Sequence, residues 1–401
     1  MNILFLNLLK FSSFEERNIY TDLLRELIKN GHNVYAVCPS ERRNSEKTNL
    51  RELGNNAILT VKTFNIQKTN ILEKGIGTLA IKRQFIKAIK KYFNGIKFDL
   101  ILYPTPPITL YGVVSFFKKR DKAKTYLMLK DIFPQNAVDI GLMETTGLNG
   151  LIYKYFRKQE KKLYAISDKI GCMSNANVEY VLKHNPEIDK EKVEVCPNSI
   201  DVKEIILNND EKKQIRKKYD LPIDKKIFVY GGNLGKPQDI PFIIECLKAE
   251  KDNDNAFFLI IGDGTEYTKL ENYSNQSRQE NLKLLKKMSS NDFDKVLLSC
   301  DVGLIFLDYR FSIPNFPSRL LSYMQASLPV LACTDCVSDL GETIVRNGLG
   351  WWCESNSIES FCFFVEQICG IQDLTCFKKN SFICLKENFD VKKCVHIFLK
   401  Q

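Results

Sequence analysis

Short apolar runs alternate with amphipathic segments along most of this sequence, and the alternation limits the folds open to it. Residues 2–9 ("NILFLNLL") have the pattern of a strand, residues 14–31 that of a helix ending at Gly31, and residues 32–39 ("HNVYAVCP") that of a second strand. A strand, a helix and a strand in this order form a right-handed crossover between parallel strands. Repetition of this unit predicts an α/β fold with doubly wound parallel sheets.

A charged segment interrupts the alternation near the middle of the chain. Residues 208–226 ("NNDEKKQIRKKYDLPIDKK") are dense in charge, and a second alternating series begins with "KIFVYGGNLGK". With 401 residues, of which 44% are hydrophobic, the chain can build two cores. We therefore expect a Rossmann-like domain over residues 1–202, a second over 203–375, and a terminal helix over 376–401 that could pack back on the first domain. Ligands bind outside the carboxyl ends of such strands, so the expected site is a cleft between the two domains.

The sequence has no feature of a membrane-spanning or secreted protein. No apolar run approaches the roughly 20 residues that cross a bilayer. The start, "MNILFLNLLKFSSFEERNIY", has neither a basic n-region nor a small-residue cleavage site. The 13 cysteines are unevenly spaced, which indicates reduced packing residues. We expect a cytoplasmic protein.

One cysteine pair has the spacing of a zinc or redox motif. It is "CTDC", from Cys333 to Cys336. No second pair and no nearby histidine completes a tetrahedral site, since the three histidines are scattered along the chain. A loop after a strand explains the motif better, so we expect no metal and no cofactor.

Positive charge is concentrated in the first half of the chain, whose overall net charge is +10. Residues 74–98 contain no acidic residue, and their apolar positions Ile81, Phe85, Ile89 and Phe93 fall on one face of a helix. A second basic cluster, "SFFKKRDKAK", follows at residues 115–124. Two interpretations stay open: the solvated face of an ordinary domain helix, or a patch that rests on anionic lipid headgroups. Nucleic acid is disfavoured because no recognised binding module is present.

Two glycine- and proline-marked turns predict a site for a diphosphate. In "VYGGNLGK" a strand is followed by a turn containing Gly231, Gly232 and Gly235, and Lys236 adds a cation where the next helix begins. In "PNFPSRLLSYM" Pro317 suits a first helical turn, and Arg319 offers a planar fork that matches phosphate oxygens. Each signal alone has a plainer explanation, a connecting turn or an arginine facing solvent. Together, at one edge of one sheet, they favour phosphate binding.

The order and spacing of these and other motifs resemble glycosyltransferase family 4. The motifs are "LMLKDIFPQNAVDIG", "VCPNSID", "YGGNLGK", "IIGDGTE" and "PSRLLSYMQASLPVLA", and they extend over nearly the whole chain. The resemblance is to retaining transferases of the GT-B fold, especially the bacterial branch that builds capsule, O-antigen or exopolysaccharide. It implies two Rossmann-like domains facing across a cleft, a sugar nucleotide, usually a UDP-sugar, bound mainly by the second domain, and an acceptor on the first.

The resemblance also implies roles for residues of the second domain. Lys236 and Arg319 would stabilise charge on the leaving diphosphate in place of a metal, and Gly232 and Asn233 would lie against the donor. The family's two glutamates are replaced by Pro314 and Ser322, which leaves donor affinity and sugar choice open. Ser322 stands at the position that grips the ribose. Asn315 and Glu266 are the neighbouring groups that could contact the donor instead, and Ser318 offers a hydroxyl near the start of the helix that carries Arg319.

Two residues of the first domain are candidates for the acceptor side. Asp131 ends the strand "TYLMLKD" where relatives place a His or Asp beside the reacting sugar, although an N-cap or turn aspartate fits equally well. Arg17, in "SFEERNIY", could meet an acceptor phosphate or pair with Glu15 or Glu16.

We therefore expect a membrane-associated glycosyltransferase that moves a sugar from a nucleoside diphosphate to a polyprenyl-diphosphate-linked glycan, with retention, at the inner face of the plasma membrane. Two alternatives remain. One is a non-catalytic GT-B partner subunit that has lost both glutamates. The other is a UDP-sugar 2-epimerase, which would need a histidine near the donor, whereas none of the three histidines lies in a donor motif.

Overall fold

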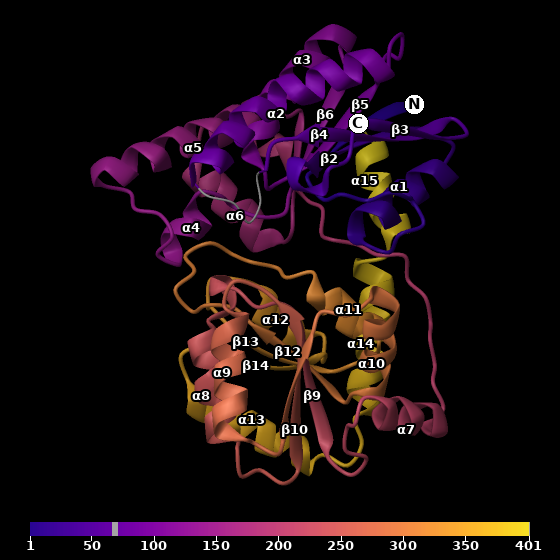
Figure 1. The fold of residues 1–401 in the computed structure, drawn as a ribbon. Coiled ribbons are helices and arrows are strands. Elements are labelled where there is room, and N and C mark those ends of the chain that lie inside the picture. Colours follow the sequence, from indigo (N-terminus) through magenta and orange to yellow (C-terminus); the bar gives the residue numbers. More distant parts are fainter. Residues whose placement is uncertain (66–70, 401) are drawn as a thin grey trace. The chain divides into compact units, whose positions relative to one another are not determined.

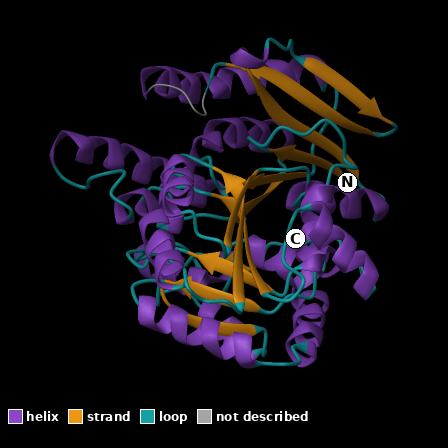
Figure 2. Ribbon diagram, turned by 60° about the horizontal axis from the view of Figure 1, so that its bottom comes forward, coloured by secondary structure: helices purple, strands orange, loops and turns teal. Residues whose placement is uncertain are grey.

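The computed structural model describes residues 1–65 and 71–400 and divides the chain into two compact units. Unit 1 comprises Met1–Asp201 together with the last helix of the chain, α15 (Val391–Leu399). Unit 2 comprises Val202–Asp390. In each unit helices flank a twisted sheet (Figures 1 and 2). The predicted fold class, two parallel-sheet α/β domains, is confirmed.

Unit 1 is built on an 8-stranded sheet of order β3-β4-β2-β1-β5-β6-β7-β8. Its strands are β1 (Asn2–Leu6), β2 (Asn33–Glu41), β3 (Asn49–Leu53), β4 (Asn56–Thr63), β5 (Leu100–Pro104), β6 (Lys124–Leu129), β7 (Lys169–Cys172) and β8 (Val193–Val195). Neighbouring strands are parallel except β3 and β4, which form an antiparallel hairpin that sequence reasoning missed. Gly54 permits the turn of this hairpin because it adopts a φ of 64°.

The helices of unit 1 cover both faces of this sheet. They are α1 (Ile19–Lys29), α2 (Ile71–Tyr92), α3 (Tyr111–Asp121), α4 (Gln135–Asp139), α5 (Gly147–Ile166), α6 (Asn175–His184) and α15. Helix α1 is capped by Asn18, whose side chain accepts hydrogen bonds from the N–H groups of Tyr20 and Thr21. The expected helical start at residue 14 is therefore wrong. Residues 14–18 form the loop before α1.

The chain ends in two helices, not in the single one expected over residues 376–401. Helix α14 (Thr375–Asn388) belongs to unit 2, whereas α15 belongs to unit 1 and lies beside α1 (Figure 1). Val395 and Phe398 of α15 are buried in the same core as Phe5 and Leu24. The apolar face of α15 therefore completes the core of the N-terminal sheet.

Unit 2 is built on a 6-stranded parallel sheet of order β11-β10-β9-β12-β13-β14. Its strands are β9 (Lys226–Asn233), β10 (Ala256–Asp263), β11 (Leu282–Lys286), β12 (Val302–Phe306), β13 (Val330–Thr334) and β14 (Gly350–Glu354). Its helices are α7 (Asn209–Lys218), α8 (Ile240–Ala249), α9 (Tyr267–Ser277), α10 (Ser290–Ser299), α11 (Arg319–Gln325), α12 (Leu340–Arg346), α13 (Ile358–Gly370) and α14. The central strands β9 and β12 mark the point where strand order reverses, which is where α/β sheets bind ligands.

Within residues 1–65 and 71–400, no helix is both long enough and apolar enough to cross a bilayer.

We predict that Phe398→Ala destabilises unit 1. The Phe398 ring packs edge-on against Tyr126, with 4.6 Å between centroids. Loss of a buried phenyl ring costs about 3–5 kcal/mol. Hydrogen exchange followed by mass spectrometry should show faster exchange in β1, β5 and β6, while the fluorescence of Trp351 and Trp352 in unit 2 keeps its urea midpoint. Phe363→Ala, on an exposed face of α13, is the matched control and should change neither. Unaltered exchange in Phe398→Ala would contradict this role of α15.

Candidate active site

The carboxyl end of β9 requires glycine for steric reasons. A Cβ atom on Gly231 would lie 2.2 Å from the ring of Phe293, which is too close for any side chain. Gly232 has a φ of 136°, a conformation that other residues rarely adopt. Gly231 is buried beneath the Phe293 ring, whereas Gly232 and Asn233 are exposed at the carboxyl end of the central strand. A ligand can approach the peptide groups of these two residues closely.

Arg319, the first residue of α11, is held beside this turn. Its guanidinium carbon lies 4.2 Å from the ring centroid of Tyr230, in a cation–π contact. A Cβ atom on Gly232 would come within 3.2 Å of Arg319 Nη2, so glycine leaves room for the guanidinium. Within residues 1–65 and 71–400, Nη1 of Arg319 is buried and has no hydrogen-bond partner. A buried N–H without a partner is costly, and an anion at this position would satisfy it.

Tyr323 fixes α11 to the sheet. Its hydroxyl accepts a hydrogen bond from the N–H of Gly231 (3.1 Å) and donates one to the carbonyl of Leu304 (2.8 Å). Burial raises the pKa of Tyr323 above its ordinary value, so the hydroxyl keeps its proton. One helical turn earlier on the same helix stands Arg319. Sequence reasoning missed Tyr323, because only the fold brings it to β9 and β12.

Lys236 lies on the surface at the start of the short 3-10 helix Lys236–Gln238. Its side chain is exposed, in contrast to Arg319. The preceding loop is shaped by Gln238, whose Oε1 accepts hydrogen bonds from Asn233 Nδ2 (2.9 Å) and from the N–H of Gly235 (3.1 Å). Gln238 was also missed from sequence. Its two hydrogen bonds hold the glycine-rich loop in one conformation.

The other predicted donor residues take up varied positions in unit 2. Glu266 precedes α9 and forms an ion pair with Lys269, so its carboxylate already has a partner. Asn315 accepts a hydrogen bond at its carbonyl from Ser338 Oγ (2.6 Å). Ser318 is exposed just before α11, and Ser322 is half-buried on that helix. Among the predicted donor residues, Gly232 lies directly beside the guanidinium of Arg319.

Asp131 follows β6 in unit 1 and is half-buried. Burial raises the pKa of its carboxyl group to about 6, against the lowering effect of hydrogen bonds from the Ile132 N–H and from Asn136. The bond from Asn136 Nδ2 to Asp131 Oδ2 is 2.7 Å long. Thr105 holds the backbone, since its hydroxyl donates to the Asp131 carbonyl (3.0 Å). Neither Asn136 nor Thr105 was singled out from sequence.

Arg17 lies in the loop before α1, is half-buried and already interacts with other groups of the protein. The loop is tied down by Arg25, which donates hydrogen bonds to the carbonyls of Phe14 and Glu16 and forms an ion pair with Asp22. Arg25 was not identified from sequence. Its contacts give this loop a defined shape.

The "CTDC" motif begins in the buried strand β13. Cys333 is buried with its sulfur 3.5 Å from that of Cys353, whereas Cys336 is exposed. In the part of the chain that the structure describes, no group of three or more His, Cys, Asp or Glu side chains could hold a metal ion.

Comparison with known proteins places this fold in a family. A model described as Glycosyltransferase Family 4 matches residues 18–204, and one described as Glycosyl transferases group 1 matches residues 211–369. A curated relative, "Probable glycosyltransferase WbjE" of Pseudomonas aeruginosa, is 22% identical over 304 residues, 75% of this chain and 73% of that protein.

Two solved structures share the fold at low sequence identity. One is Anabaena Alr3699/HepE in complex with UDP, with a TM-score of 0.68 and 13% identity over 100% of this chain and 99% of that one. The same Anabaena protein is also similar in its complex with UDP-glucose. The other is WaaG, a glycosyltransferase involved in lipopolysaccharide biosynthesis, with a TM-score of 0.68 and 14% identity over 100% of both chains.

These matches and the two parallel-sheet units define a glycosyltransferase of the GT-B class. Together the two family models match residues 18–204 and 211–369, most of the chain, and they place it in glycosyltransferase family 4.

We predict that Asp131→Asn stabilises the protein at neutral pH. Because the folded-state pKa of Asp131 is about 6, above its unfolded value, the stability that this group contributes is full below about pH 4 and is lost as the pH rises through 6. The amide cannot ionise. Asp131→Asn should therefore match the wild type at pH 4 and exceed it by about 1–3 kcal/mol at pH 7.5.

Urea unfolding at a series of pH values measures this difference. Glu52→Gln, a carboxyl-to-amide change on an exposed position of β3, is the control and should give no such pH dependence. A constant difference between Asp131→Asn and the wild type from pH 4 to 7.5 would mean that Asp131 titrates normally.

Proposed function

We propose that this protein transfers a sugar from a nucleoside-diphosphate-sugar, a UDP-sugar, to a polyprenyl-diphosphate-linked glycan during the synthesis of a surface polysaccharide, with retention at the anomeric carbon. The donor part of this proposal is supported by one observation: Nη1 of Arg319 is buried without a hydrogen-bond partner among the described residues, and its guanidinium lies beside Gly232 of β9. A sugar nucleotide brings a diphosphate, whose oxygens suit this position. UDP is favoured because the similar Anabaena structure holds it.

In the proposed donor site, positively charged side chains held in place by the fold would stabilise the leaving diphosphate. Arg319 offers a planar cation, Lys236 adds an exposed one, and Gly232 and Asn233 present backbone groups without steric obstruction. Such groups stabilise the negative charge that grows on the β-phosphate as the glycosidic bond breaks, so we propose a reaction without a metal ion. Glu266, Asn315, Ser318 and Ser322 are the proposed contacts for the sugar and the ribose.

Retention follows from attack on the face that the diphosphate leaves. The C–O bond between the sugar and the β-phosphate breaks, a new C–O bond forms to the acceptor hydroxyl, and the departing phosphate oxygen takes the hydroxyl proton. No protein base is required for this step. Asp131, whose pKa of about 6 leaves it mostly ionised at neutral pH, would orient the acceptor or the reacting sugar as a hydrogen-bond acceptor. Arg17 is the proposed contact for an acceptor phosphate.

A lipid-linked acceptor would bring the protein to the inner face of the plasma membrane. Cysteines such as Cys38, Cys172 and Cys246 are buried as thiols, which suits a reducing compartment. Helix α2 and the residues after it present exposed cations to such a surface: Lys82, Arg83, Lys87, Lys90, Lys91 and Lys97. The side chain of Lys74 is outside the described residues. Surface polysaccharide synthesis is proposed because the similar structure WaaG is that of a glycosyltransferase involved in lipopolysaccharide biosynthesis.

A non-catalytic partner subunit is the second candidate, favoured by one observation. Pro314 is buried and Ser322 is half-buried where the family's two glutamates are expected. A 2-epimerase is weaker, because His32, His184 and His396 all belong to unit 1.

We predict that UDP stabilises the wild-type protein against heat and that Arg319→Ala abolishes the shift. At 100 times its dissociation constant a ligand adds about 2.7 kcal/mol, which thermal unfolding detects easily. GDP, dTDP and ADP, measured alongside, test nucleotide choice. The control is Arg346→Ala on α12, an exposed arginine paired with Glu342, which should keep the full shift. If no diphosphate stabilises the wild type at millimolar concentration, that result would favour the non-catalytic partner subunit over the enzyme.

We predict that sugar transfer survives removal of divalent metals and retains the anomeric configuration. Excess EDTA should change the rate of UDP release less than about twofold, because the charge stabilisation comes from fixed cations. NMR of the product's anomeric proton reports its configuration. Loss of turnover in EDTA that Mg²⁺ or Mn²⁺ restores would contradict the metal-free mechanism, and an inverted product would contradict front-face attack.

A further inference from the structure

Helix α5 of unit 1 presents an exposed apolar surface that the proposed function does not use. Leu151 is 62% exposed, Ile152 48% and Tyr155 41%. Leu142, in the loop that leads to α5, is 58% exposed. Large apolar side chains that gather at one place on a surface mark sites of interaction with another protein or a membrane.

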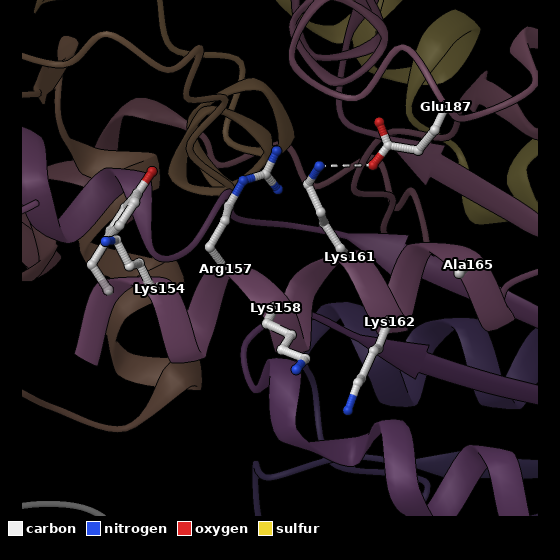
Figure 3. A pocket seen from close by; sticks show the side chains of 8 residues that line it. Lys154, Arg157, Lys158, Lys161, Lys162, Ala165 and Glu187 are labelled. Atoms are coloured by element: carbon white, nitrogen blue, oxygen red, sulfur yellow. Dashed lines mark ion pairs between the residues drawn. The ribbon is translucent and has the colours of Figure 1, made fainter. Parts of the chain in front are cut away.

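The same helix carries a dense set of cations. Lys154, Arg157, Lys158, Lys161 and Lys162 line an open groove of about 540 Å³ along it (Figure 3). Arg157 and Lys161 are paired with Glu160 and Glu187. Lys154 and Lys158 are exposed and in no ion pair within the described part of the chain. Their charge is thus available to an anionic partner.

Helical spacing arranges the two kinds of side chain in sequence along one stripe. Leu151, Tyr155, Lys158 and Lys162 follow one another at intervals of four, three and four residues, so they share a face of α5. Figure 3 shows Lys158 and Lys162 pointing to the same side of the helix. The stripe is apolar at Leu151 and Tyr155 and basic at Lys158, whereas the half-buried Lys162 lies over the ring of Tyr111, 5.7 Å from its centroid. Exposed apolar side chains beside exposed cations are the two components by which a protein surface binds an anionic membrane interface.

The opposite face of α5 is anchored in unit 1. Leu163 and Tyr164 are fully buried, and the ring of Phe156 packs against Phe133 with 5.1 Å between centroids. Arg157 Nη2 also donates a hydrogen bond to the carbonyl of His184 (2.9 Å). The exposed stripe is therefore presented by a helix that is already folded, and its apolar side chains need no rearrangement to meet a partner.

Helix α2 differs from α5 in this respect. Among its described side chains, Ile81, Phe85, Ile89 and Phe93 are buried in the core and Ile86 is half-buried, so over residues 80–93 this helix presents mainly charge to solvent. Electrostatic attraction alone is weakened by salt. A surface that combines cations with exposed apolar groups binds a bilayer through both contributions.

We propose that α5 and the loop before it form the membrane-contact element of unit 1. Leu151, Ile152 and Tyr155 enter the boundary between headgroups and acyl chains of an anionic phospholipid bilayer, while Lys154 and Lys158 bind its phosphates. This inference rests on the proposed function, because a lipid-linked acceptor lies at such a surface. A nucleic acid would match the cations but leave the aliphatic side chains without a partner, which is why the bilayer is favoured.

Co-sedimentation of the full chain with large unilamellar vesicles tests the proposal. The wild type should bind vesicles of phosphatidylcholine with phosphatidylglycerol and bind pure phosphatidylcholine much more weakly. Leu151→Ser/Ile152→Ser should lower the affinity at least about tenfold, because the buried apolar area is lost. Lys154→Glu/Lys158→Glu should lower it by a similar factor, since each basic residue near the surface contributes.

Matched controls separate position from composition. Ile206→Ser/Ile223→Ser removes exposed aliphatic residues of unit 2, and Lys213→Glu/Lys217→Glu makes the same charge change on α7. Both should bind vesicles as the wild type does. In Leu151→Trp the new indole should be quenched by brominated lipid, whereas in Ile206→Trp it should not be.

The results can overturn this inference without touching the donor site. If the wild type does not bind anionic vesicles, or if Leu151→Ser/Ile152→Ser binds them as tightly as the wild type does, α5 is not the membrane-contact element. Binding that depends on the lysines alone, with equal affinity for duplex DNA, would identify a general polyanion surface and also overturn it. The UDP-induced thermal shift should be unchanged in the α5 variants. Failure of that shift in the wild type would count against the proposed function, not against vesicle binding.

Discussion

The hydrogen bonds of one buried hydroxyl group organise the C-terminal sheet around its candidate site. Tyr323 joins α11 to β9 through the Gly231 N–H and to β12 through the Leu304 carbonyl. The ring has room because Gly303 lacks a side chain: a Cβ there would lie 2.5 Å from Tyr323 ring atoms. Two glycines and one tyrosine thus fix where α11 begins. The position of Arg319 depends on them.

This arrangement explains why Arg319 is held without a partner for Nη1. Its guanidinium lies over the ring of Tyr230, so its orientation is set by a contact that leaves Nη1 without a hydrogen-bond partner among the described residues. A flexible surface arginine would find a carboxylate or water, and would lose rotamer entropy on binding an anion. Arg319 has already lost that freedom on folding. The fold therefore prepares a cation for a ligand in unit 2.

The sequence allowed the two sheets, the glycine turn and Arg319 to be predicted, because their signals are local. Alternating patterns and steric needs of a turn are present in a few adjacent residues. What was missed depends on distant contacts: Gln238 and Tyr323 matter only once the loop and α11 are folded, and Asn136 matters because it reaches Asp131. The hairpin of β3 and β4 and the break between α14 and α15 were missed because their apolar patterns are weak or continuous. Ser318, Ser322 and Asn315 were proposed as donor contacts from the order of the motifs alone. Motif order does not establish that a side chain contacts a ligand.

The resemblance to the family implies glutamates where this chain has Pro314 and Ser322, and in the proposed complex this would change what donor recognition rests on. A serine hydroxyl at Ser322 extends less far from α11 than a glutamate carboxylate would, and Pro314 offers no side-chain polar group. In the proposed complex the ribose and sugar would then be bound by neutral groups and backbone, whose hydrogen bonds contribute less than those of charged acceptors. The diphosphate contacts of Arg319 would carry a larger share of donor affinity. Because those contacts are common to every nucleoside-diphosphate-sugar, sugar choice must come from the few neutral hydrogen bonds that remain.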